Sequence, residues 1–320
     1  MYERFYGLRE RPFDLTPNPR FIYLSGCHLE ALSVVHYGIV GRKGITLIVG
    51  EAGTGKTTVI RAALEALAQP TARCVYLSNP TLTRAEFYEF LATSFGLTTE
   101  AAGSKARFLS EFEGLLVQRN KVKDLTALVI DEAQSLSLEL MEEIRLLGNL
   151  ETLTDKLLPV VLAGQPELAD MLDRPALRQL KQRVALRADL APLGLRQVAA
   201  YVAGRIRKAG GDPLNVFTKE AIVLIHERSG GIPRTISVLC DNAMLGGFAA
   251  AVKPIGPDIV EEVSRDFRLR GPGVAGNRGN NGNGRSTGDA SPGTWHKETE
   301  HVAAMPGHRV SAPNPEESRR

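Results

Sequence analysis

The sequence predicts an α/β fold with a mostly parallel sheet, followed by a small all-α lid domain and a disordered tail. Three observations support this. Strand-like and helix-like segments alternate between residues 40 and 190, residues 194–268 carry only helical patterns, and the composition changes near residue 271. At 320 residues the chain has room for two compact domains, and its hydrophobic content of 43% is normal for a protein with a buried core.

Five apolar segments are the predicted strands, at residues 45–49, 73–78, 126–131, 157–162 and 184–187. Helices are predicted between them, one from Thr83, whose spacing to Glu86 is that of a capping box, one over 104–123 and one from Ser137. Four more are expected near 194–209, 218–228, 233–250 and 257–267. We therefore expect three parts. Residues 1–190 form an α/β nucleotide-binding core that includes an N-terminal strap, residues 191–270 form a helical lid, and residues 271–320 form a disordered low-complexity tail.

Charge and cysteine content exclude few classes of protein. A net charge of +3 does not by itself indicate nucleic acid or an anionic membrane as a partner. Cys27, Cys74 and Cys240 are widely spaced and lack metal-ligand spacing, which suits a reducing compartment. No apolar run reaches the roughly 18–20 residues of a membrane span, and the first residues lack a signal-peptide pattern. We expect a cytoplasmic protein.

The clearest functional motif is G-x-x-x-x-G-K-[ST], which residues 50–57 match between a predicted strand and a predicted helix. Glycines let successive backbone N–H groups point at phosphate oxygens, and the following helix directs its positive dipole end to the same charge. Lys56 is expected to reach the β- and γ-phosphates, and Thr57 to ligate Mg²⁺. The predicted ATP-binding residues of this segment are Gly50, Glu51, Ala52, Gly53, Thr54, Gly55, Lys56, Thr57 and Thr58.

A second motif lies at residues 127–132, where four apolar residues precede Asp131 and Glu132. This pattern is typical of a buried strand that ends in carboxylates at the carboxyl edge of a parallel sheet, where ligands bind. Asp131 is predicted to hold Mg²⁺ directly or through water, and Glu132 to orient and deprotonate an attacking water. The adjacent pair favours hydrolysis of ATP over transfer to another acceptor.

The order of these motifs, with Gly-Gly-Ile-Pro-Arg at 230–234, resembles that of AAA+ ATPases, which are P-loop NTPases with a three-layer core. The N-terminal segment resembles the general secretion pathway protein A (ExeA-type) family more specifically, over about residues 1–268. Two departures are Asn18, where an aspartate is expected, and a low-complexity tail in place of a membrane span or wall-binding module. The matching positions are 5–8, 12–13, 16–19, 21–24, His28, 30–32, 163–168 and 182–184.

The resemblance implies further roles. Arg234 would sense the γ-phosphate, Arg183 would reach into a neighbouring subunit's site with Arg178 as the alternative, and Gln165 would orient water. A run of cations such as that at 174–187 is, however, usually solvated surface, and Arg234 has the alternative role of capping its helix on a solvated face. Two roles are open for Tyr6, Pro12 and Phe13, an apolar clamp on adenine or a strap packed against the core. His28, at a helix start, is expected to be structural.

The predicted function is ATP hydrolysis with Mg²⁺ by a homo-oligomer, a ring or a filament, that assembles with ATP. Three biological roles are open. The first is envelope assembly or export through a partner, such as a membrane protein at the inner face of the membrane. The second is regulation of transposition on DNA, and the third is a nucleotide-dependent binding switch with little turnover. The N-terminal block favours the first, the basic segment the second, and the Asp131-Glu132 pair disfavours the third.

Overall fold

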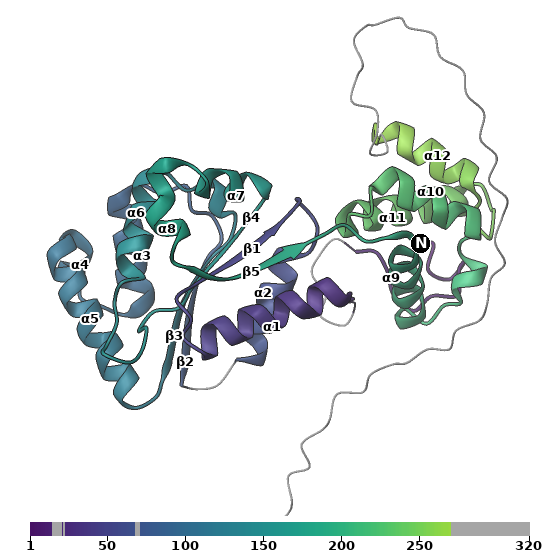
Figure 1. Ribbon diagram of the computed structural model, residues 1–320. Helices are drawn as coiled ribbons and strands as arrows, with labels where there is room; N and C mark the ends of the chain where they lie inside the picture. Colours follow the sequence, from purple (N-terminus) through teal and green to yellow (C-terminus); the bar gives the residue numbers. More distant parts are fainter. Residues whose placement is uncertain (15–20, 22, 68–70, 270–320) are drawn as a thin grey trace, which may run out of the picture. The chain divides into compact units, whose positions relative to one another are not determined.

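The structure, a computed structural model, describes residues 1–14, 21, 23–67 and 71–269 (Figure 1). Its centre is a five-stranded parallel sheet with strand order β2-β3-β4-β1-β5. The strands are β1 Ile45–Gly50, β2 Ala72–Leu77, β3 Leu125–Ile130, β4 Val160–Gly164 and β5 Val184–Leu190. Because all five run parallel, their carboxyl ends meet at one edge of the sheet, and the segments that follow them lie near one another.

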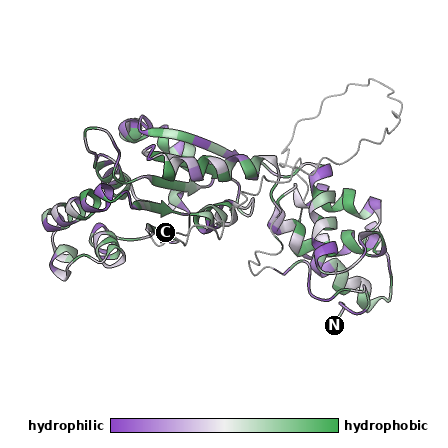
Figure 2. Ribbon diagram, turned by 90° about the horizontal axis from the view of Figure 1, so that it is seen from below, coloured by the Kyte–Doolittle hydropathy of each residue, from purple (hydrophilic) through white to green (hydrophobic). Residues whose placement is uncertain are grey.

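Helices cover both faces of the sheet and make three layers, as predicted (Figure 1). One face packs against α1 Gly26–Val40 and α2 Lys56–Ala66. The other packs against α3 Arg84–Phe95, α4 Thr99–Gly103, α5 Lys105–Lys121, α6 Leu138–Leu147, α7 Pro166–Leu172 and α8 Arg178–Lys181. Side chains alternate between the faces, so Leu47 packs toward α3–α8 and Ile48 toward α1 and α2. The three central strands β1, β3 and β4 are accordingly mostly hydrophobic, whereas the edge strands β2 and β5 also carry charged residues, Arg73, Arg187 and Asp189 (Figure 2).

The predicted elements are confirmed, with shifted ends. The capping box at Thr83 and Glu86 starts α3. The predicted strand at 157–162 begins only at Val160, because Pro159 has no N–H to donate to the ladder, although its carbonyl accepts from the Leu128 N–H at 3.0 Å. Short 3₁₀ turns complete the elements, at η2 Ala133–Ser135, η3 Pro175–Leu177 and η4 Pro213–Asn215.

Four helices follow β5 and build a second hydrophobic core. They are α9 Leu195–Lys208, α10 Lys219–Ser229, α11 Pro233–Ala249 and α12 Pro257–Asp266, close to the predicted bounds. The sequence explains where three of these helices begin. Thr218 caps α10 by accepting the Ala221 N–H, and α11 and α12 each open with proline, which has no N–H to leave unpaired.

The N-terminal segment joins the core of these four helices and not the core under the sheet. Tyr2, Tyr6, Leu8 and Phe13 are all buried in the same cluster as α9–α12. The Tyr6 hydroxyl donates to the Met244 carbonyl at 3.2 Å, and Phe13 is fully buried. This placement differs from the expected strap on the α/β core. The aromatic side chains instead pack among the helices α9–α12.

Two predictions concern residues outside the described part of the chain. The tail at 271–320 and the departure at Asn18 both lie there. Among the described helices, none combines the length and the apolarity that crossing a bilayer requires.

Candidate nucleotide site

The loop between β1 and α2 has the backbone that phosphate binding needs. Gly53 and Gly55 have φ angles of 82° and 105°, in the left-handed region that favours glycine. Their surroundings also leave little room for a side chain. A Cβ on Gly53 would lie 2.8 Å from the Cβ of Arg234, and one on Gly55 would lie 2.9 Å from Nε2 of His28. Gly55 is the N-cap of α2, so the helix directs its free N–H groups into the loop.

Lys56 is a buried cation that points back into this loop. Its side chain is 4% exposed, and Nζ donates to the carbonyls of Gly50 at 2.7 Å and Glu51 at 3.1 Å. Burial lowers its pKa, while the nearby charges of Glu132 and Asp131 act in the opposite direction. Within the described residues the ammonium forms no ion pair. A buried ammonium bound only to carbonyls is suited to an anion in the loop.

Asp131 follows the last residue of β3 and meets Thr57, as the two motifs predict. Asp131 is 3% exposed, and its Oδ2 accepts from the Thr57 hydroxyl at 2.6 Å and from the Tyr76 hydroxyl at 2.7 Å. Its Oδ1 accepts from the Glu132 N–H at 3.0 Å. Burial and the bond to Asp131 raise the pKa of Tyr76, so the phenol stays protonated and donates.

The hydroxyl of Thr57 and the carboxylate of Asp131 are the oxygen donors that Mg²⁺ prefers. Over the described residues no cluster of three or more His, Cys, Asp or Glu side chains could hold a metal ion alone. A Mg²⁺ ion held by this pair would therefore need further oxygen ligands from water or a bound phosphate.

Glu132 is held by two glutamine amides. Its Oε2 accepts from Nε2 of Gln134 at 2.6 Å and from Nε2 of Gln165 at 3.3 Å. The backbone N–H of Gln165 in turn donates to Oε1 of Gln134 at 3.1 Å. Glu132 also has a φ of 51°, a conformation unfavourable for a side chain with a Cβ. The structure thus brings the predicted general base and the predicted polar sensor into contact.

The predicted arginines lie in two different places. Arg234 is the second residue of α11, and its backbone N–H donates to the Gly53 carbonyl at 3.3 Å, so α11 begins against the loop. Arg183 precedes β5, where Val184 pairs with Ile45 at the amino end of β1. The loop starts at the other end of β1, about 17 Å away at the usual rise per residue. Arg183 therefore lies beyond reach of the loop of its own chain. Arg178, its alternative, is exposed at the start of α8.

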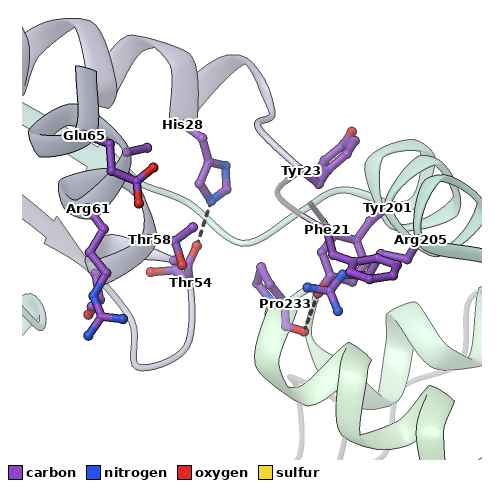
Figure 3. A pocket seen from close by; sticks show the side chains of 13 residues that line it. Phe21, Tyr23, His28, Thr54, Thr58, Arg61, Glu65, Tyr201, Arg205 and Pro233 are labelled. Carbon is purple, nitrogen blue, oxygen red and sulfur yellow. Dashed lines mark hydrogen bonds between the residues drawn. The ribbon is translucent and has the colours of Figure 1, made fainter. Parts of the chain in front are cut away.

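A cavity of about 230 Å³ adjoins the loop (Figure 3). On one side, Phe21, Tyr23 and Tyr201 form an aromatic wall, with the rings of Tyr23 and Tyr201 edge to face at 5.7 Å. The Arg205 guanidinium lies 5.0 Å from the Tyr201 ring centroid. The opposite side comes from α1, the loop and α2, through His28, Thr54, Thr57, Thr58, Arg61 and Glu65.

Tyr6, Pro12 and Phe13, the candidates for an adenine clamp, do not line this cavity and are buried. The Pro12 carbonyl accepts from Arg205 at 2.9 Å, so this segment supports the cavity from behind. The apolar surface beside the loop is formed instead by the aromatic wall of Phe21, Tyr23 and Tyr201.

His28 contacts the loop directly. Its Nε2 donates to the Thr54 carbonyl at 2.8 Å, and its Nδ1 lies 2.6 Å from the Ser25 hydroxyl, which donates to Nδ1 when the ring is neutral. Burial lowers its pKa, which favours that neutral state. The side chain has a structural place, as expected, and the element that it supports is the phosphate loop.

A family model described as an AAA domain matches residues 40–172. The match includes the loop, Lys56, Thr57, the Asp131-Glu132 pair and Gln165. This chain is an AAA domain protein.

The predicted resemblance to general secretion pathway protein A is confirmed. The chain is 44% identical over 251 residues to General secretion pathway protein A of Aeromonas hydrophila, across 78% of this chain. It spans 45% of the length of that relative, which is therefore a much longer protein.

Several solved structures share the fold of this chain. The ORC2 protein of Aeropyrum pernix, in its ADPNP-ADP complexes, superimposes with a TM-score of 0.58 at 16% identity, covering 80% of this chain and 71% of that one. Cdc6p of Pyrobaculum aerophilum has a TM-score of 0.58 at 20% identity, covering 81% and 70%. At these identities the likeness concerns the fold alone.

Proposed function

We propose that this AAA domain protein binds ATP with Mg²⁺ and hydrolyses it. The observation that supports this most strongly is the 2.6 Å contact between Thr57 and Asp131, which unites two motifs 74 residues apart beside the buried Lys56. The phosphates would lie against the N–H groups of the loop and α2, and the Lys56 ammonium would exchange its carbonyl partners for phosphate oxygens. Adenine would lie against the aromatic wall of Phe21, Tyr23 and Tyr201.

Thr57 and Asp131 would hold Mg²⁺, which when bound neutralises charge on the phosphates. Glu132 would accept a proton from the attacking water, with its carboxylate aimed by Gln134 and Gln165. Arg234 would sense the γ-phosphate, since α11 begins against Gly53. Loss of that phosphate would then change the position of α11 relative to the loop.

The position of Arg183 supports the proposal that the chain assembles into a homo-oligomer. At the end of the sheet opposite the loop it has no role at its own site, whereas in a homo-oligomer it could stabilise transition-state charge at a neighbour's site. Hydrolysis would then depend on formation of an ATP-dependent ring or filament.

For the biological role we propose envelope assembly or export through a partner, a membrane protein among the candidates. Similarity to General secretion pathway protein A supports this role. The DNA alternative has less support. Two cations of the basic segment are paired with carboxylates, Lys181 with Asp173 and Arg187 with Asp189. The third alternative, a nucleotide-dependent binding switch with little turnover, is disfavoured because the amides of Gln134 and Gln165 orient the Glu132 carboxylate.

The test is nucleotide binding by calorimetry beside a phosphate-release assay. Glu132→Gln should bind ATP with wild-type affinity and lose about 10²–10⁴-fold in turnover, the usual contribution of a general base. Lys56→Ala should lose affinity. Lys219→Ala, which removes an exposed cation from α10, is the matched control and should match wild type. Folded wild-type protein that binds no adenine nucleotide would contradict the proposal. Strong stimulation by duplex DNA at low salt would instead favour the DNA role.

A further inference from the structure

Helices α1 and α5 end in the same unusual way. In each, the residue after the C-cap adopts the left-handed conformation, Arg42 with a φ of 49° and Lys123 with a φ of 63°. Each end closes with the hydrogen bonds of a Schellman motif, from Lys43 N–H to the Gly38 carbonyl at 3.0 Å and from Asp124 N–H to the Arg119 carbonyl at 2.9 Å. Glycine is the usual residue at this position. Here a long cationic side chain occupies it at both ends, as Arg268 does after α12.

The two helix ends adjoin. Nη2 of Arg42 donates to the Asp124 carbonyl at 2.9 Å. Val40, Arg42 and Lys123 line one groove of about 330 Å³, with Leu67 and Leu125 among the other lining residues. Both ends lie where β1 and β3 begin, so this surface is at the amino edge of the sheet, away from the nucleotide loop at the carboxyl edge.

Apolar side chains are exposed among the cations. Val40 is 50% exposed, Val122 is 67% exposed and Tyr37 is 54% exposed. The Lys43 ammonium lies 5.2 Å from the Tyr37 ring centroid. We name this surface the basic edge and define it as Tyr37, Val40, Arg42, Lys43, Lys121, Val122 and Lys123.

The charge of the basic edge is not balanced locally. Residues 37–43 contain no acid, and the one acid in residues 119–125 is Asp124, whose carboxylate pairs with Arg119 at 3.3 Å. The four cations Arg42, Lys43, Lys121 and Lys123 therefore add up to a positive surface. Helix carboxyl ends attract cations, but that attraction does not explain why three apolar side chains are exposed beside them.

We propose that the basic edge docks on the surface of an anionic lipid bilayer. Cations interleaved with exposed apolar side chains match the boundary between headgroups and acyl chains, where phosphate and hydrocarbon meet. A nucleic acid backbone would satisfy the cations but leave the valines against a hydrated surface. Because the nucleotide loop lies at the other edge, docking and nucleotide binding are independent, and this inference does not rest on the proposed ATPase activity.

The test is co-sedimentation of the full chain with vesicles of phosphatidylcholine and phosphatidylglycerol in equal amounts. The variant Arg42→Gly/Lys123→Gly removes two cations and places glycine where φ is positive, which offsets the loss of the hydrogen bond from Arg42 to the Asp124 carbonyl, so its thermal midpoint should stay close to that of wild type. Its vesicle partition should fall by about 20-fold or more, from about fivefold per cation near an anionic surface. Arg268→Gly is the matched control, since Arg268 has a φ of 52° after α12 and should leave partition unchanged.

A second variant tests the apolar contribution. Val122→Ser changes an exposed side chain and should weaken partition without lowering the thermal midpoint. Lys56→Ala should bind vesicles like wild type, which separates this inference from nucleotide binding. The inference is overturned if wild type binds phosphatidylcholine vesicles equally well, if the double variant partitions like wild type, or if duplex DNA displaces the vesicles and needs the same two cations.

Discussion

Replacing Tyr76 by Phe removes one hydroxyl and tests the central contact of the nucleotide site. That hydroxyl donates to Oδ2 of Asp131 at 2.7 Å, the oxygen that also accepts from Thr57. The ring itself stays in place, so the variant isolates a single hydrogen bond. Asp131 is 3% exposed. In the variant its carboxylate keeps two hydrogen-bond donors among the described residues, the Thr57 hydroxyl and the Glu132 N–H.

A hydrogen bond to a charged group contributes about 1.5–3 kcal/mol, and a buried acceptor that loses its donor is not rehydrated. We expect Tyr76→Phe to lower the free energy of unfolding by that amount. Because Asp131 would also be less firmly oriented, affinity for the Mg²⁺–ATP complex should fall by about 5–30-fold, the equivalent of 1–2 kcal/mol.

The chain offers a matched control in Tyr88, whose hydroxyl donates to the buried carboxylate of Glu143. Glu143 keeps two cations, Lys105 at 2.7 Å and Arg84 at 3.1 Å, so Tyr88→Phe should cost less stability and leave nucleotide affinity unchanged. Urea denaturation followed by circular dichroism measures the first effect and calorimetry the second. An unchanged urea midpoint for Tyr76→Phe would refute the reasoning.

Two other predictions concern assembly and pH. If Arg183 acts on a neighbouring site, Arg183→Ala and Glu132→Gln should each be inactive alone but recover part of the ATPase rate when mixed, because one intact site forms across the pair. No recovery at any ratio would exclude action between subunits. For His28, the lowered pKa means that the unfolded chain holds more protons between that pKa and about 6.5, so stability is lost as pH falls through this window. The unfolding free energy of His28→Gln should depend less on pH there, and equal slopes would rule out this contribution.

The sequence was sufficient to predict the sheet, the order of elements and the contact between the two motifs. Strand composition, the loop pattern and the acidic strand end are local signals, and a parallel sheet brings its carboxyl ends together whatever the details of packing. The start of β4 was misplaced by three residues because Leu157 and Leu158 are as apolar as the strand itself. Hydrophobicity alone does not distinguish a residue that pairs with the neighbouring strand from a buried residue just before the strand begins.

Residues that act through tertiary contact were not predictable in the same way. Tyr76 reaches Asp131 because β2 neighbours β3, and no spacing in the sequence reports that adjacency. Gln134 lies two residues after Glu132, and its role depends on the 3₁₀ turn that folds it back. The aromatic wall takes Tyr201 from α9 and Tyr23 from the N-terminal region, segments whose meeting depends on packing of the helices.

The N-terminal segment gives the helical region a second covalent link to the sheet. Residues up to Phe13, and Phe21, belong to the helical core, while α1 from Gly26 belongs to the sheet, and β5 leads back from the sheet into α9. Any opening or closing of the helices over the loop therefore has to move two connections at once, and one of them enters α1 two residues before His28, which contacts the loop.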